Sequence, residues 1–284
     1  MHSFVSFNDR IVSAAEVNLS AAAPAALYGK GIFTTLEIFR SEPFLWKKHW
    51  QRLISNADRV EIDLSGFKRE SVLLSLQRII EKNQITDARC RLTFFDTSAG
   101  SIWKSPAGIK TNLLIQTAEA HPVRTRSLRV DFSPFPVNSR SPLAGVKSCN
   151  YLENLLALER AKADGFEEAV RLNERGEVVS ACLANIFWIS AGRLYTPDLE
   201  TGCLAGTTRE FILELAEAEG LPFETVGEKK SGLLAADEVF LTSSGIGIGT
   251  VGEIGGRRFK DEVSGRLRKI FRENKGREVE NFRS

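Results

Sequence analysis

The 284-residue chain has few of the side chains on which metal and disulfide chemistry depend. It contains one methionine, three histidines (His2, His49 and His121) and four cysteines (Cys90, Cys149, Cys182 and Cys203). The cysteines form no close CxxC pair, and the histidines lie far apart without HExxH spacing. These spacings predict neither a zinc site nor a disulfide scaffold. We therefore expect no bound metal.

The chain also lacks a strong excess of charge and any long apolar run. Its formal net charge is +2, and no basic stripe is interleaved with aromatic residues, so nucleic acid is not an expected partner. Asp9 and Glu16 interrupt the N-terminal region, so no signal peptide is expected there. No apolar run approaches the length that crosses a membrane. These features indicate a cytoplasmic protein without membrane segments.

Helical and extended patterns occur in both halves of the chain, which predicts a mixed α/β (α+β) fold. Residues 4–12 read as a hairpin, 44–60 and 71–82 as amphipathic helices, and 90–95 and 111–116 as strands. Ala118–Arg126 has little periodicity, and we place a domain boundary there. The predicted domains are a small N-terminal α/β domain, residues 1–120, and a larger C-terminal domain, residues 121–284.

Lys147 has the clearest chemical setting in the sequence. It stands between Val146 and Ser148, just before a predicted helix for which Asn150 is a candidate N-cap. Partial burial and the positive end of a helix dipole both disfavour an ammonium ion. A neutral lysine amine is a nucleophile that can form a Schiff base with an aldehyde. The alternative is a solvated lysine at the end of a loop.

Two segments have the composition of phosphate-binding sites. Gly206-Thr207-Thr208 opens a predicted helix, whose first N–H groups favour an anion; the alternative is a capping box with Thr207 as N-cap and Glu210 three residues later. Ser243-Ser244-Gly245 follows a predicted strand. The residues after it predict a hairpin rather than a helix, so the glycines there do not belong to a dinucleotide-binding fold. A nucleophilic lysine with two phosphate sites indicates pyridoxal 5'-phosphate chemistry.

Several spaced motifs resemble the class IV aminotransferases, which include branched-chain and D-amino acid aminotransferases and aminodeoxychorismate lyase. The matching motifs are Tyr28-Gly-Lys-Gly-Ile-Phe33-Thr-Thr35, His49-Trp-Gln-Arg52, Lys147-Ser-Cys-Asn-Tyr151, Ala184-Asn185-Ile-Phe-Trp188, Gly206-Thr-Thr-Arg209 and Thr242-Ser-Ser-Gly245. The resemblance covers essentially the whole chain. It implies the two-domain D-amino acid aminotransferase-like fold (pyridoxal-phosphate fold type IV), in which the C-terminal domain binds the cofactor. It also implies an active site between the domains and a homodimer.

The resemblance assigns roles to individual residues. Lys147 corresponds to the Schiff-base lysine and catalytic base, and Arg52 to the arginine that reaches the cofactor phosphate. Cofactor-binding positions also include Ser180, Asn185, Gly206, Thr207, Thr208, Ser243, Ser244 and Gly245. Phe33 occupies a substrate-pocket position where aminotransferases often have tyrosine. Lys30 is a candidate for binding a substrate carboxylate, as are Lys104 and Arg140, although each of these three is also compatible with a solvated surface charge.

One position departs from the family pattern. Members usually carry a glutamate five residues before the Ala-Asn-Ile-Phe asparagine, where its carboxylate keeps the pyridine nitrogen protonated; this chain has Ser180. We expect Glu177, three residues away, to point to the opposite strand face. A serine cannot hold a proton on the ring by charge, so we expect a largely unprotonated ring nitrogen.

Three functions remain open at this point. The first is transfer of an amino group from an amino acid to a 2-oxo acid through Lys147. The second is elimination of pyruvate from aminodeoxychorismate, which gives 4-aminobenzoate and is favoured by the Phe33-Thr34-Thr35 and Ala184–Trp188 segments. The third is a non-catalytic cofactor-binding protein, suggested by Ser180.

Overall fold

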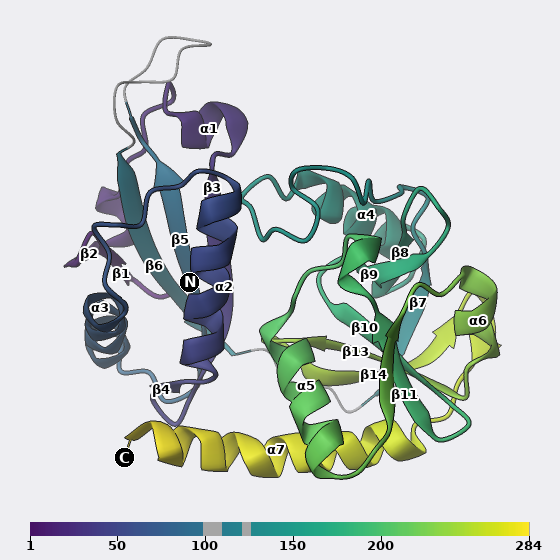
Figure 1. Ribbon diagram of the computed structural model, residues 1–284. Coiled ribbons are helices and arrows are strands. Elements are labelled where there is room, and N and C mark those ends of the chain that lie inside the picture. The colour runs from purple at the N-terminus through teal and green to yellow at the C-terminus, as the bar shows by residue number, and fades with distance from the viewer. Residues whose placement is uncertain (99–109, 121–125, 284) are drawn as a thin grey trace. The chain divides into compact units, whose positions relative to one another are not determined.

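The computed structural model describes residues 1–98, 110–120 and 126–283, and side chains through residue 279. Contacts between Cα atoms divide the chain into two units (Figure 1). The first contains Met1–His121, Val146–Asn150 and Glu278–Ser284, and the second contains Pro122–Gly145 and Tyr151–Arg277. A single division after residue 120 would place Lys147 in the second unit, whereas here the Val146–Asn150 segment is grouped with the first.

The first unit is built on a six-stranded antiparallel sheet with the order β2-β1-β6-β5-β3-β4. Its strands are β1 (Phe4–Phe7), β2 (Arg10–Ser13), β3 (Gly31–Phe39), β4 (Glu42–Pro43), β5 (Ala88–Asp96) and β6 (Thr111–Glu119). The helices are the 3-10 turn η1 (Ala14–Glu16), α1 (Pro24–Tyr28), α2 (Trp46–Arg59) and α3 (Arg69–Lys82).

Alternation along the strands gives this sheet two different faces. Ile32, Leu36 and Ile38 of β3 are fully buried and share one core with Leu53 of α2 and Leu76 of α3. The intervening residues, which begin with Phe33, therefore point to the other face of the sheet. The residues of β5 that lie directly opposite Phe33 and the alternate residues of β3 point to this same second face.

The second unit is built on a nine-stranded mixed sheet with the order β12-β11-β10-β13-β14-β7-β8-β9, in which β15 also pairs with β14. Its strands are β7 (Leu128–Phe132), β8 (Glu168–Leu172), β9 (Val178–Ala181), β10 (Asn185–Ser190), β11 (Arg193–Pro197), β12 (Phe223–Val226), β13 (Glu238–Ser243), β14 (Gly247–Ile254) and β15 (Arg257–Arg258). The helices are α4 (Leu152–Ala163), η2 (Leu199–Thr201), α5 (Thr207–Ala218), α6 (Lys230–Ala235) and α7 (Glu262–Arg283).

The second sheet also has a distinct hydrophobic side. Val170, Ala181, Ile186 and Leu241 share a core with Leu233 of α6. On the opposite side, Ala169 and Cys182 pack against Ala157 and Ala161 of α4 in a smaller cluster. Residues of β8 that alternate with Val170, and that therefore include Ala169 and Arg171, face α4.

The predicted mixed α/β fold is confirmed, and several predicted elements lie where expected. The hairpin of residues 4–12 turns at Asn8 and Asp9, which both have positive φ. The residues after Gly245 form a hairpin and not a helix, as predicted, because β14 pairs with β15 across the Gly255-Gly256 turn. Two details were wrong. Tyr151, not Asn150, is the N-cap of α4, and Gly206, not Thr207, is the N-cap of α5, so the predicted capping box does not form.

Candidate active site

The Lys147 segment lies against the edge of β3. The backbone N–H of Phe33 donates to the Lys147 carbonyl (2.9 Å), and the N–H of Cys149 donates to the Gly31 carbonyl (2.8 Å). Ser148 forms an isolated antiparallel bridge with Ile32. Ser148 therefore shares the core face with Ile32, and Lys147 projects on the same side of the sheet as Phe33.

Two glycines allow this close approach. Gly29 ends α1 in a left-handed conformation (φ +62°), and a Cβ on it would lie 3.4 Å from the Asn150 backbone. Gly31 lies beneath Cys149, because a Cβ there would be 3.0 Å from the Cys149 Sγ and 2.9 Å from the Phe94 carbonyl oxygen. The two glycines therefore let the strand lie close to the lysine-bearing segment.

One face of α2 positions the lysine segment. The side chain of Asn56 accepts a hydrogen bond from the Lys147 backbone N–H (2.7 Å). One turn earlier, Arg52 donates to the Thr34 hydroxyl oxygen (2.8 Å), which also lies 2.6 Å from His49 Nδ1. Burial, Arg52 and Lys147 hold the pKa of His49 well below its usual value. The imidazole is therefore neutral, and its Nδ1 shares a hydrogen bond with the Thr34 hydroxyl whose direction is set by the tautomer.

The Lys147 amine has a strongly altered acidity. Burial, followed by the positive charges of Arg52 and Arg91, lowers the pKa of Lys147 from 10.5 to about 7. Its Nζ lies 4.5 Å from the centroid of the Phe33 ring, and the Arg91 guanidinium carbon lies 3.6 Å from the same centroid. A substantial fraction of this amine is thus uncharged and nucleophilic near neutral pH.

Of the predicted substrate-pocket residues, Phe33 lies beside the amine. Lys30 instead pairs with Asp96, with 3.2 Å between its Nζ and an oxygen of that buried carboxylate. Lys104 lies outside the described residues. Arg140 is an exposed residue of the second unit, and Ser141 follows it at the turn before Gly145.

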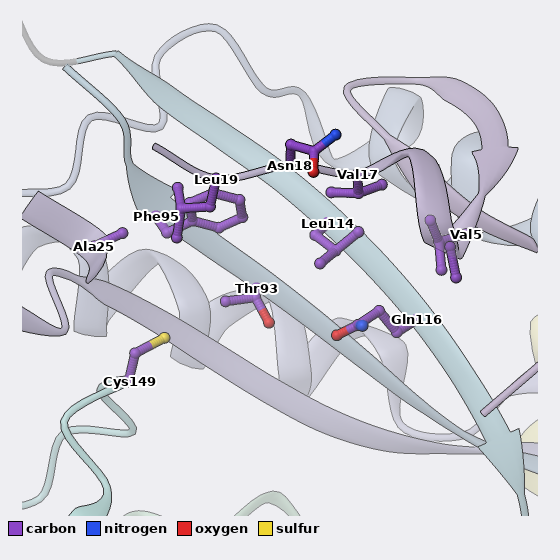
Figure 2. Close-up of a pocket in the computed structure, with 11 residues that line it drawn as sticks. Val5, Val17, Asn18, Leu19, Ala25, Thr93, Phe95, Leu114, Gln116 and Cys149 are labelled. Carbon is purple, nitrogen blue, oxygen red and sulfur yellow. The ribbon is translucent and has the colours of Figure 1, made fainter. Parts of the chain in front are cut away.

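A cavity of about 340 Å³ opens on the Phe33 side of the first sheet (Figure 2). Strands β1, β5 and β6 contribute Val5, Thr93, Phe95, Leu114 and Gln116 to it, and Cys149 lies at its edge. Thr93 is the cross-strand partner of Phe33, and Cys149 is two residues from Lys147. Cys149 is the lining residue that belongs to the lysine-bearing segment, and most of the side chains around the cavity are apolar.

In the second unit, Asn185 joins the two predicted phosphate segments. Its backbone pairs with Thr242, the residue before Ser243-Ser244-Gly245. Its Nδ2 donates to the Leu204 carbonyl (2.8 Å), and a Cβ on Gly206 would lie 1.9 Å from its Oδ1. Only glycine fits at position 206, so the N-terminus of α5 and the end of β13 lie close together around Asn185.

The buried side chains near these segments contain polar atoms suited to an additional binding partner. The Thr242 Oγ1 and the Arg209 Nε are buried without a hydrogen-bond partner in the described part of the chain. Thr207 and Thr208 are also buried at the first turn of α5. Such groups normally find partners in folded proteins, and a phosphate next to a helix N-terminus would supply acceptors for them. The residues present therefore fit a phosphorylated cofactor.

Sequence reasoning did not identify Arg91 or Asn56. Arg91 is a polar residue in the otherwise largely apolar β5 segment. It lies two residues before Thr93, a spacing that places both side chains on one face of the sheet and could have identified it. Asn56 lies seven residues after His49, a spacing that places both on one side of a helix.

Metal-ligating clusters of three or more His, Cys, Asp or Glu side chains do not occur among residues 1–98, 110–120 and 126–283. No helix in the same ranges is long and apolar enough to span a membrane.

Comparison with known proteins decides the family. The model of the amino-transferase class IV family matches residues 31–254. The chain belongs to this family. Aminodeoxychorismate lyase of Bacillus subtilis (strain 168) is 30% identical over 241 residues, which cover 84% of this chain and 82% of the relative. Branched-chain-amino-acid aminotransferase of Escherichia coli (strain K12) is 25% identical over 265 residues, or 89% of this chain and 85% of the relative.

A solved structure has the same fold. The branched-chain aminotransferase of the thermophilic archaeon Thermoproteus uzoniensis, determined with norvaline, superimposes with a TM-score of 0.90 at 24% identity over 96% of this chain and 94% of that one. The two-domain fold of the class IV aminotransferases is therefore confirmed for this chain. Members of the family are pyridoxal-phosphate-dependent enzymes, and the chain is a member of that group of enzymes.

Proposed function

We propose that this protein is a pyridoxal-phosphate-dependent aminotransferase that transfers the amino group of an amino acid to a 2-oxo acid, with Lys147 as the residue that bonds to the cofactor. The observation that carries this proposal is the Lys147 amine. Its pKa of about 7 makes it partly neutral at physiological pH, and its backbone is held by Asn56 and by β3. A neutral amine can both attack an aldehyde carbon and accept a proton from a substrate.

Several residues are proposed to hold the cofactor. We propose that Arg52, the first turn of α5 at Gly206, Thr207 and Thr208, and the Ser243-Ser244-Gly245 turn bind its phosphate, and that Asn185 holds the two turns together. Ser180 is proposed to meet the pyridine nitrogen. When bound, pyridoxal phosphate supplies an electron sink for the bonds at the substrate carbon that carries the amino group.

Arg91 is a better candidate than Lys30 for binding a substrate carboxylate. Its guanidinium lies over Phe33, beside the Lys147 amine, and its Nε donates to the Thr93 hydroxyl (3.2 Å), whereas Lys30 is paired with Asp96. An arginine can bind a carboxylate through two parallel hydrogen bonds. We propose that Arg91 orients the substrate through its carboxylate.

The first test is the identity of the cofactor-linked residue. Purified protein incubated with pyridoxal phosphate should become yellow, and borohydride reduction followed by peptide mapping should place the label on Lys147. The variant Lys147→Ala should bind the cofactor without this linkage. A label on another lysine, or an unchanged linkage in the variant, would refute the assignment.

Elimination of pyruvate from aminodeoxychorismate is the second candidate function. The 30% identity to the Bacillus subtilis lyase favours it. Assays with amino acid and 2-oxo acid pairs, and with aminodeoxychorismate, separate the two activities. Stable binding of the cofactor with no turnover of either substrate class would instead support the non-catalytic function suggested by Ser180.

We also propose a homodimer and a cytoplasmic location. In α4, Leu152, Leu155 and Leu156 are 62%, 44% and 47% exposed, and Leu183 nearby is 42% exposed. Exposed leucines grouped in this way are typical of protein interfaces. Sedimentation should show a dimer for the wild type and a monomer for Leu155→Glu. The control Leu74→Glu changes a leucine of α3 that is about as exposed as Leu155, and this variant should remain a dimer. The four free cysteines are consistent with a reducing compartment.

A further inference from the structure

A buried arginine lies next to Ser180. In the antiparallel pair of β8 and β9, the Cα partner of Ser180 is Arg171. Directly opposed residues share one face of a sheet, with Cβ atoms roughly 4.5–5.5 Å apart. Arg171 is only 2% exposed, and it faces α4 together with Ala169. The position where the family usually has a carboxylate therefore has a serine hydroxyl and a guanidinium as neighbours.

The hydrogen bonds of Arg171 leave its Nε unused. Its Nη1 donates to the Asn154 Oδ1 (3.2 Å), and its Nη2 donates to the carbonyl oxygens of Phe135 and Pro136 (3.4 and 3.3 Å). The Nε is buried and has no hydrogen-bond partner in the described part of the chain. A buried N–H without an acceptor is costly, so this donor is suited to a further acceptor.

The positive charge of Arg171 is only weakly neutralised. An oxygen of Glu153 lies 3.6 Å from the Nη2, but that carboxylate side chain is 79% exposed, and an exposed ion pair contributes little. Since a guanidinium keeps its charge at every accessible pH, this face of the sheet carries a persistent positive charge.

Two other carboxylates near this strand pair are engaged elsewhere. Glu168 accepts hydrogen bonds from the backbone N–H groups of Cys182 (2.9 Å) and Leu183 (3.1 Å), so it stabilises the turn between β9 and β10. Glu177 accepts from Arg175 (2.9 Å) and from the Asn173 amide (2.9 Å). Neither carboxylate takes the place of the glutamate that is missing at position 180.

We propose that Arg171 and Ser180 together form the contact for the pyridine nitrogen of the cofactor, and that this contact keeps the nitrogen unprotonated. This inference rests on the proposed cofactor function. The Arg171 Nε–H can only donate, so it can bond only to an unprotonated pyridine nitrogen, and the Ser180 hydroxyl can donate to the same nitrogen. A fixed positive charge next to the ring also disfavours a second positive charge on it. An unprotonated ring withdraws electrons more weakly from the substrate.

The test reads the ring nitrogen directly. The holoprotein is prepared with pyridoxal phosphate labelled with ¹⁵N in the ring, and the ¹⁵N chemical shift is recorded between pH 6 and 9. The wild type should give the shift of an unprotonated pyridine. In Arg171→Gln, which removes the charge but keeps hydrogen-bonding groups, the protonated fraction should rise roughly tenfold, equivalent to one pKa unit.

Three further variants complete the comparison. Arg171→Lys retains the positive charge and should resemble the wild type, and the double variant Arg171→Gln/Ser180→Glu should give a protonated ring. Arg175→Gln, a control on the same hairpin, should leave the shift unchanged. If Arg171→Gln does not fold, wild type and Arg171→Lys still test the inference, because a protonated ring in either would overturn it.

The outcomes separate this inference from the proposed function. A protonated ring in the wild type, or the same shift in wild type and Arg171→Gln, would overturn the role of Arg171 while leaving the Lys147 linkage intact. Failure of the wild type to bind the labelled cofactor would instead refute both proposals.

Discussion

The replacement Arg91→Leu should raise the pKa of the Lys147 amine. The Arg91 guanidinium carbon and the Lys147 Nζ lie 3.6 and 4.5 Å from one ring centroid, so these two atoms are at most about 8 Å apart. At that distance, two unit charges repel by about 2 kcal/mol for an effective dielectric constant of 20, and by about 0.5 kcal/mol in bulk water. Because about 8 Å is the largest possible separation, these energies are minimum values, and the shift should be at least roughly 0.4 pKa units.

Competitive labelling measures this pKa in the apoprotein. Trace acetic anhydride is applied between pH 5 and 11, and the extent of modification of the Lys147 peptide is compared with that of exposed lysines in the same sample. The wild type should show a midpoint near pH 7 at Lys147. Arg91→Leu should move the midpoint upward, and Arg89→Leu, a change on the same strand, should not. A wild-type midpoint near the ordinary lysine value of about 10.4 would refute the reasoning.

Three further changes have defined expected results. Gly206→Ala should weaken the binding of pyridoxal phosphate in a fluorescence titration at least about tenfold, since its methyl group would overlap the Asn185 side chain, and unaltered affinity would contradict the proposed phosphate site. Asn56→Leu should lower the free energy of unfolding in urea by about 1–3 kcal/mol, because it leaves the Lys147 backbone N–H without its acceptor; a loss of less than about 0.5 kcal/mol would contradict that role. In the apoprotein, Lys147→Met should be more stable than the wild type near pH 7, and this advantage should fall by about 1.4 kcal/mol per pH unit between pH 7 and 10. Between pH 7 and 10 the unfolded wild type binds more protons than the folded wild type, so the stability of the wild type rises with pH. A difference in stability between the two proteins that does not change with pH would contradict the lowered pKa of Lys147.

Much of the fold could be predicted because local patterns and tertiary structure agree. The apolar periodicity of residues 44–60 and 71–82 matches α2 and α3. Contacts between distant segments were not predictable in this way. The bond from Asn56 to Lys147 joins residues 91 apart in sequence, and periodicity contains no information about such a pair.

The electrostatics of the site were likewise only partly predictable from the sequence. Burial of Lys147 was expected from its neighbours in sequence, and burial is the largest cause of its lowered pKa. The positive charges of Arg52 and Arg91 also lower this pKa, and their nearness to Lys147 depends on contacts between distant segments. Similarly, Ser180 could be recognised as unusual from the sequence, but its neighbour Arg171 emerges only from the register of β8 and β9.

The two unusual features of the site should affect different parts of a rate profile. A ring nitrogen without a proton weakens electron withdrawal, so removal of the substrate proton depends more heavily on the base. Lys147, with a pKa of about 7, is present as a base at neutral pH in a way that an ordinary lysine is not. Arg91→Leu should therefore move the rising limb of the pH dependence of kcat to higher pH. Arg171→Gln should instead change the plateau of kcat and leave the midpoint of that limb in place. If both variants shifted the midpoint equally, the assignment of Arg91 to the base and of Arg171 to the ring would be wrong.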